Sequence, residues 1–133
     1  MEQVAVTGMG IVSPVGSDVD SYWKALTNGE HGFTAIPDGE GLSGNLLWGA
    51  VPDSFLEASH VSKAAVRNAD RFTQFAIAAA GDAFAMAGVE TPPTHTAVIL
   101  GSTMGGLPLL AKTHEQFVAD PRHVTPKLMA LVI

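Results

Sequence analysis

Apolar positions at helical spacing are the clearest pattern in the chain. After Asp70 they recur at intervals of three and four: Phe72, Phe75, Ala76, Ala79, Ala80, Ala83 and Ala87. This spacing predicts a helix that follows Asp70 and ends at Gly88. Its apolar face is mostly alanine, and we therefore expect a neighbouring element to approach it closely.

A shorter helix is predicted over residues 17–28. Ser17 and Asp18 can cap its first turn, because a short polar side chain accepts hydrogen bonds from the free amides there, and Gly29 would end it. The apolar residues at helical spacing are expected to be buried: Val19, Tyr22, Trp23 and Leu26. A further helix is predicted over about residues 107–118.

Strands are predicted where short apolar runs meet glycine or proline. The runs are Val4–Thr7, Ile11–Val12, Leu46–Val51 and Thr96–Gly101. Strand, helix and strand in this order predict an α/β fold with a mixed sheet and flanking helices, in which parallel strands are joined by a right-handed crossover. The sequence ends on the apolar run LMALVI without a cap or polar tail, so we expect this portion of the fold to be incomplete.

Composition narrows the function classes. The chain has 133 residues, 47% of them apolar, a formal net charge of −6, and no cysteine. A negative charge disfavours nucleic acid as a partner. The lack of cysteine excludes disulfides, zinc–thiolate sites and a cysteine nucleophile within these residues. No apolar run approaches the roughly 18 residues that a membrane span needs, so no membrane partner is predicted and a cytoplasmic location is the simplest interpretation.

The first glycines imitate a dinucleotide-binding loop. Gly8 and Gly10 begin a G-x-G-x-x-G pattern, but Ser13 stands in place of the third glycine. Pro14 removes a backbone N–H where the helix should begin to donate to phosphate. We therefore interpret Gly8 and Gly10 as residues that permit a positive φ or close packing of the backbone.

Two further motifs are incomplete. GSTMGGLP, residues 101–108, has the glycine spacing of a P-loop, but leucine and proline replace the lysine and hydroxyl that hold phosphate and magnesium. HEQFV, residues 114–118, begins like a zinc-protease helix, but Val118 replaces the second histidine. The sequence therefore predicts no cofactor and no metal site.

Taken together, several segments resemble the start of a β-ketoacyl-acyl-carrier-protein synthase. They are VAVTGMGIVSPVG, YWKALTNGEHGF, WGAV, RNADRFTQFAIAAAGDAF, AVILGSTMGGL and DPRHVTP. The likeness is to the elongating type of bacterial fatty-acid synthesis and to polyketide ketosynthases, and it runs in register from about Gln3 to Pro126. It implies a thiolase-like fold, of which residues 1–133 would be the N-terminal portion, ending before the nucleophile motif.

The resemblance also implies an activity and partners. Members of the family move an acyl chain onto a cysteine, decarboxylate a malonyl-carrier thioester and join the two by Claisen condensation, in fatty-acid or polyketide biosynthesis. The implied partners are the acyl carrier protein and a second subunit, in a homodimer or with a ketosynthase partner. Without a cysteine, the chain alone is expected to be inactive. A non-catalytic interaction subunit, such as a chain-length factor or a truncated paralogue, remains the alternative.

Four residues take site roles from the resemblance. Met104 matches a position that helps close the floor of the acyl pocket across the dimer interface, and an ordinary core methionine is the competing interpretation. Arg67 and Arg122 match basic positions that dock the acidic carrier protein. Lys63 is grouped with them, although for Lys63 alone a solvated surface lysine is the better interpretation.

The chain departs from the family pattern at several of these places. Ala64, Asn68 and His123 stand where docking residues are commonly basic, which implies a weaker or differently distributed carrier surface. Lys127 and Ala130 stand in a stretch where aromatic residues and a proline are usual. That stretch lines the dimer interface and pocket in the family, so these departures bear on acyl preference.

Overall fold

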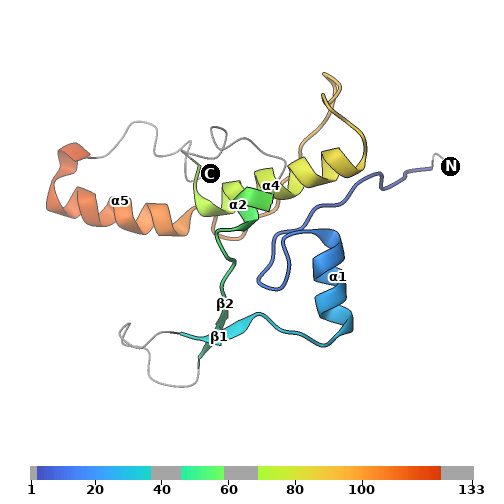
Figure 1. Cartoon of the computed structure of the whole chain (residues 1–133). Helices are drawn as coiled ribbons and strands as arrows, with labels where there is room; N and C mark the ends of the chain where they lie inside the picture. Colours follow the sequence, from blue (N-terminus) through green and yellow to red (C-terminus); the bar gives the residue numbers. More distant parts are fainter. Residues whose placement is uncertain (1–2, 37–45, 59–68, 124–133) are drawn as a thin grey trace. The chain divides into compact units, whose positions relative to one another are not determined.

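The computed structural model describes residues 3–36, 46–58 and 69–123 (Figure 1). The chain forms two compact units. The first comprises Met1–His60 and Ala78–Thr91, and the second comprises Val61–Ile77 and Pro92–Ile133. The elements in chain order are α1 (Val19–Thr27), β1 (Phe33–Ala35), β2 (Leu47–Gly49), α2 (Phe55–Ala58), α4 (Arg71–Met86), α5 (Leu107–Ala119) and the 3-10 helix η1 (Pro121–His123).

Helix α1 begins and ends where the sequence predicts. The Asp18 carboxylate accepts a hydrogen bond from the Ser21 backbone N–H at 2.9 Å, and this capping fixes the first turn. Gly29 follows the helix with a φ of 71°, a conformation that glycine adopts without strain. The predicted burial is wrong for part of its apolar face, because Trp23 is 65% exposed and Leu26 is also exposed. Helical spacing identifies residues that share a face, but burial requires an element to cover that face.

Helix α4 confirms the prediction from alanine spacing. It covers Arg71–Met86, and Gly88 follows it with a φ of 67°. Within the first unit, its backbone lies against the N-terminal segment: a Cβ added to Gly8 or to Gly10 would collide with an α4 carbonyl oxygen. The close approach predicted for these glycines is therefore confirmed. A positive φ was the other predicted reason, and it is wrong, since neither glycine has one.

The strand predictions are confirmed only in part. The predicted strand near residues 46–51 is present as β2, which pairs antiparallel with β1 in the register Phe33↔Gly49, Thr34↔Trp48 and Ala35↔Leu47. Within the described ranges, Val4–Thr7, Ile11–Val12 and Thr96–Gly101 form no strand, and β1–β2 is the only sheet. The parallel pairing with a right-handed crossover is accordingly not found there. Hydropathy marks segments that suit burial, whereas a strand exists only when a neighbour completes its hydrogen bonds.

Helix α5 and the short η1 belong to the second unit. Pro108 lies in the first turn of α5, where its missing N–H leaves no helical bond unmade. Thr113 is buried, and its hydroxyl donates to the Leu109 carbonyl at 2.8 Å. The helix ends at the C-cap Asp120, whose backbone N–H donates to the Gln116 carbonyl at 2.9 Å.

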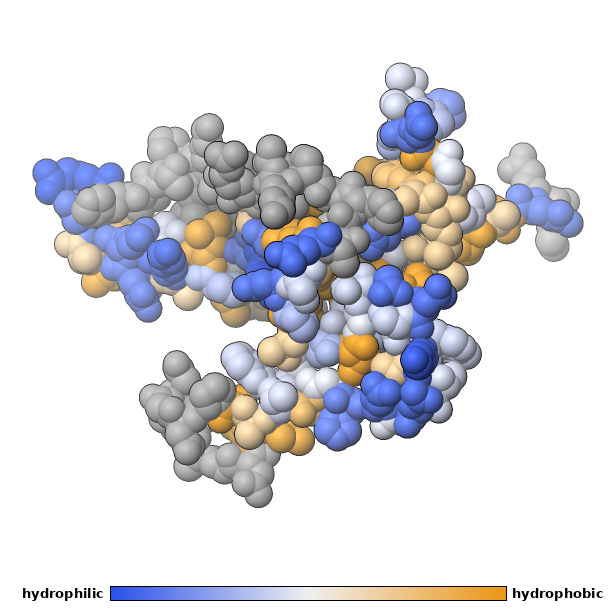
Figure 2. All heavy atoms as spheres, in the orientation of Figure 1, coloured by the Kyte–Doolittle hydropathy of each residue, from blue (hydrophilic) through white to orange (hydrophobic). Residues whose placement is uncertain are grey.

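Apolar surface is extensive in both units. Among the described residues the buried apolar side chains are Ala25, Phe55 and Ala78, whereas Val4 and Ile99 are almost fully exposed. Figure 2 shows hydrophobic atoms on the surface beside hydrophilic ones. No helix in the described part of the chain combines the length and the apolar character that a bilayer crossing would need.

Candidate functional site

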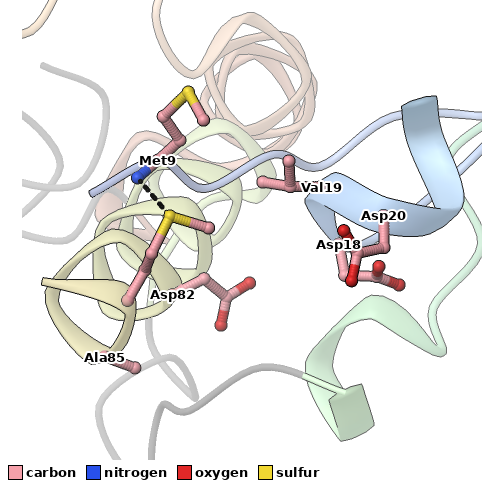
Figure 3. Close-up of a pocket in the computed structure, with 7 residues that line it drawn as sticks. Met9, Asp18, Val19, Asp20, Asp82 and Ala85 are labelled. Atoms are coloured by element: carbon pink, nitrogen blue, oxygen red, sulfur yellow. Dashed lines mark hydrogen bonds between the residues drawn. The ribbon is translucent and has the colours of Figure 1, made fainter. Parts of the chain in front are cut away.

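A pocket of about 410 Å³ lies in the first unit, between the N-terminal segment, the start of α1 and the end of α4 (Figure 3). Its lining residues are Met9, Asp18, Val19, Asp20, Asp82, Ala85 and Met86. The Met9 backbone N–H donates to the Met86 Sδ at 3.3 Å across the pocket wall. The N-terminal segment is therefore joined to α4 by this contact as well as by the close packing of Gly8 and Gly10.

The carboxylates of this pocket do not form a reactive centre. Asp18 is engaged as the cap of α1, and it also accepts the Ser21 hydroxyl at 2.6 Å. These bonds from Ser21 stabilise the charged form and lower the pKa of Asp18 below its usual value of 3.8. Its role is thus structural, and the lining residues include no nucleophile. Within residues 3–36, 46–58 and 69–123 no group of three or more acidic or histidine side chains could hold a metal ion.

Met104 projects from the glycine-rich turn before α5, in the second unit. Its side chain is 62% exposed, so within the described residues it is not a core methionine. The turn is held by the Gly105 N–H, which donates to the Ser102 hydroxyl at 2.9 Å, and Gly105 has a φ of 53°. The predicted projection of a flexible apolar side chain from this turn is confirmed, and its proposed contact with an acyl chain stays a prediction.

Arg122 lies on η1 and its side chain is 89% exposed. Its Nη2 donates to Asp120 Oδ2 at 2.7 Å and its Nε donates to Asp120 Oδ1 at 3.0 Å. This pairing lowers the pKa of Asp120 and raises the pKa of Arg122, because each charge favours the other.

The other predicted docking residues, Arg67 and Lys63, lie outside the described residues, as do Ala64, Asn68, Lys127 and Ala130. The structure therefore does not bring the predicted basic residues together. It does add Asp120, which the sequence analysis missed. A carboxylate two positions before Arg122, at the predicted end of a helix, was the available signal.

Comparisons with known proteins test the predicted family. Residues 1–131 match the family model described as "Beta-ketoacyl synthase, N-terminal domain". The chain is 36% identical over 128 residues to the 3-oxoacyl-[acyl-carrier-protein] synthase 2 of Vibrio harveyi, covering 93% of this chain and 31% of that protein. It is 34% identical over 138 residues to the protein of the same name from Staphylococcus aureus strain COL, covering 99% of this chain and 33% of that protein.

A solved structure gives a similar result. The ishigamide ketosynthase/chain length factor superimposes with a TM-score of 0.78 at 29% sequence identity, covering 96% of this chain and 33% of that chain. The chain therefore spans about a third of the length of these relatives. The structural neighbour is a ketosynthase, and the described residues combine helices with a small sheet, as a portion of such a fold would. The chain belongs to the β-ketoacyl synthase family, in which it matches the N-terminal domain.

Proposed function

We propose that this chain is the N-terminal segment of a 3-oxoacyl-[acyl-carrier-protein] synthase. Such an enzyme would condense an acyl thioester with a malonyl-carrier thioester, with loss of carbon dioxide, in fatty-acid or polyketide synthesis. The observation that carries the proposal is the family match over residues 1–131, together with 36% identity to a relative of that name. The thiolase-like fold would be completed by polypeptide that corresponds to the other two thirds of the relatives.

The reactive thiol would come from that other polypeptide. Condensation by this route needs a nucleophile that accepts the acyl chain, and the family uses a cysteine thiolate. The present chain has no cysteine, so it offers no thiol for transfer. Its contribution would be structural: the N-terminal segment packs on the alanine face of α4 through Gly8 and Gly10, and the chain carries the turn with Met104.

Met104 would act on substrate selection. It is exposed on a turn that Gly105 and Ser102 hold in place, so its side chain is free to meet a ligand or a second subunit. In a homodimer it would close the floor of the partner subunit's acyl pocket and limit chain length by its volume. Methionine suits such a position because its unbranched side chain adapts to different shapes.

Carrier docking would use the basic residues Arg67 and Arg122, with Lys63 beside them in sequence. A carrier protein that is acidic is attracted by such residues, which raise the rate of encounter and fix its orientation. Arg122 is well placed for this because its guanidinium is exposed at the end of α5.

A chimera tests the proposal. Residues 1–133 would replace the matching third of the Vibrio harveyi 3-oxoacyl-[acyl-carrier-protein] synthase 2, and 3-oxoacyl product would be measured from acyl and malonyl carrier thioesters. We expect the chimera to form product and the chain alone to form none. The control is the same chimera with alanine in place of the catalytic cysteine. A folded chimera that forms no more product than this control would contradict the proposal.

A non-catalytic subunit is the second candidate. It is favoured by one observation, the match to a solved structure whose title pairs a ketosynthase with a chain length factor. The two candidates differ in the polypeptide that accompanies this chain. A cysteine motif followed by two histidine motifs in the continuing reading frame would favour the enzyme, and their absence would favour the subunit.

A further inference from the structure

We infer that Asp120 restrains carrier docking by holding Arg122 in an ion pair that an acidic partner must displace. The inference rests on the proposed function, in which Arg122 docks the carrier protein. It concerns the regulation of that contact by a residue of this chain, and it follows from how the end of α5 is built.

The two side chains meet as a planar fork. Nη2 and Nε of Arg122 donate to the two carboxylate oxygens of Asp120 at 2.7 and 3.0 Å, and Nε lies 3.2 Å from Oδ2 as well. The Arg122 backbone N–H also donates to Asp120 Oδ1 at 3.0 Å. Guanidinium and carboxylate groups bind in this bidentate way because their geometries match. An incoming carboxylate or phosphate would need the same donors of Arg122.

Exposure shows which partner can move. The Asp120 side chain is 24% exposed and stands on the C-cap of α5, whose backbone is tied to Gln116. The Arg122 side chain is far more open, with 89% of it exposed. Arg122 can therefore exchange Asp120 for an external anion without disturbing the helix.

Helix stability does not explain a carboxylate at this position. The C-terminus of a helix carries partial negative charge, so an acidic residue there is unfavourable and a basic one is favourable. The last turn of α5 contains no basic residue. What Asp120 does provide is local neutralisation of Arg122, which weakens the attraction of an acidic protein at a distance.

The expected effect is modest, because exposed ion pairs are weak and screened by salt. Asp120→Asn keeps the side-chain shape and removes the charge. We expect it to tighten binding of an acidic acyl carrier protein by about two- to fivefold at low salt, and to lose this gain at high salt. Glu115→Gln removes an equal charge from an exposed position of the same helix and serves as the control, for which we expect a smaller gain.

The test is a double-mutant cycle on the full chain, with carrier binding followed by fluorescence anisotropy. The variants are Asp120→Asn, Arg122→Ala and the pair together, with circular dichroism to confirm that each is folded. We expect Arg122→Ala to weaken binding more in the Asp120→Asn background than in the wild type. A gain from Asp120→Asn that persists in the Arg122→Ala background would overturn the inference, because it would show simple charge repulsion.

Two other outcomes separate this inference from the proposed function. If Arg122→Ala weakens binding but Asp120→Asn gives no gain, docking by Arg122 stands and restraint by Asp120 is wrong. If Arg122→Ala has no effect even in the Asp120→Asn background, the docking role itself fails, and the inference fails with it.

Discussion

Gly10 lies directly against the backbone carbonyl of Ala79, and Gly8 lies in the same way against Ala83, one turn further along α4. At each glycine a Cβ would meet the carbonyl oxygen at less than contact distance. The N-terminal segment thus packs on the helix backbone within the first unit, a separation that only glycine opposite alanine permits.

Gly10→Ala should therefore destabilise the first unit. The added methyl group cannot be accommodated without moving the N-terminal segment from α4, and overpacking of this kind costs roughly 1–3 kcal/mol. The measurement is the midpoint of urea unfolding followed by circular dichroism. Gly101→Ala is the matched control, because no heavy atom lies within 4 Å of its added Cβ. Equal midpoints for the two variants would show that the close approach at Gly10 is not real.

Asp18→Ala should weaken α1, and the loss should depend on pH. The bonds from Ser21 lower the pKa of Asp18 below 3.8, so the charged cap is more stable in the folded chain. A lowered folded pKa adds stability that is fully present above 3.8 and is lost as the pH falls through the folded pKa. Because the cap is exposed, we expect a loss of about 0.5–1 kcal/mol near neutral pH.

Helix content and urea unfolding at neutral and at strongly acid pH measure this effect. Asp18→Asn is the control, since asparagine caps a helix without titrating. Its difference from Asp18→Ala should change little with pH, whereas the difference between wild type and Asp18→Ala should narrow in acid. A wild-type advantage that stays constant down to acid pH would rule out a role for the charge.

The isolated chain should associate in solution. Val98 and Ile99 lie side by side in sequence and are 88% and 96% exposed, and Val4 is similarly open. Exposed apolar patches drive association because contact removes them from water. Sedimentation velocity over a range of concentrations should show species larger than a monomer, and replacing both Val98 and Ile99 with threonine should reduce them. A monomer at every concentration, with a sharp melt that does not depend on concentration, would contradict this expectation.

Met104 should set product length in the chimeric synthase. Met104→Trp adds volume at the proposed pocket floor and should shift the products to shorter acyl chains, while Met104→Ala should admit longer ones. Thr103→Ala changes an exposed neighbour on the same turn and should leave the product profile unaltered. Gas chromatography of the released products gives the profile. An identical distribution for both Met104 variants would remove Met104 from the pocket.

Helices were more predictable than strands in this chain, for a physical reason. A helix satisfies its own backbone hydrogen bonds, so the alanine spacing of α4 and the Asp18 cap of α1 were sufficient to locate them. A strand depends on its neighbours, and apolar runs such as Val4–Thr7 form none in the described residues. For the same reason the exposure of Trp23 could not be predicted, since it depends on whether another element covers α1.

The candidate site was predictable only where one residue acts alone. Met104 projects from its turn because Gly101, Gly105 and Gly106 break the regular structure before α5, a signal present in the sequence. The pairing of Arg122 with Asp120 depends on side-chain geometry at a helix end, which spacing alone does not determine.

The most direct test of the central claim is the intact mass of the protein after incubation with an acyl-carrier thioester. The claim is that this chain is a ketosynthase segment whose reactive thiol lies in other polypeptide. We predict no covalent acyl adduct on the 133-residue chain, which has no cysteine, and one acyl group on the chimera, at its catalytic cysteine. An acyl adduct on the chain alone, or a folded chimera that accepts none, would contradict the account.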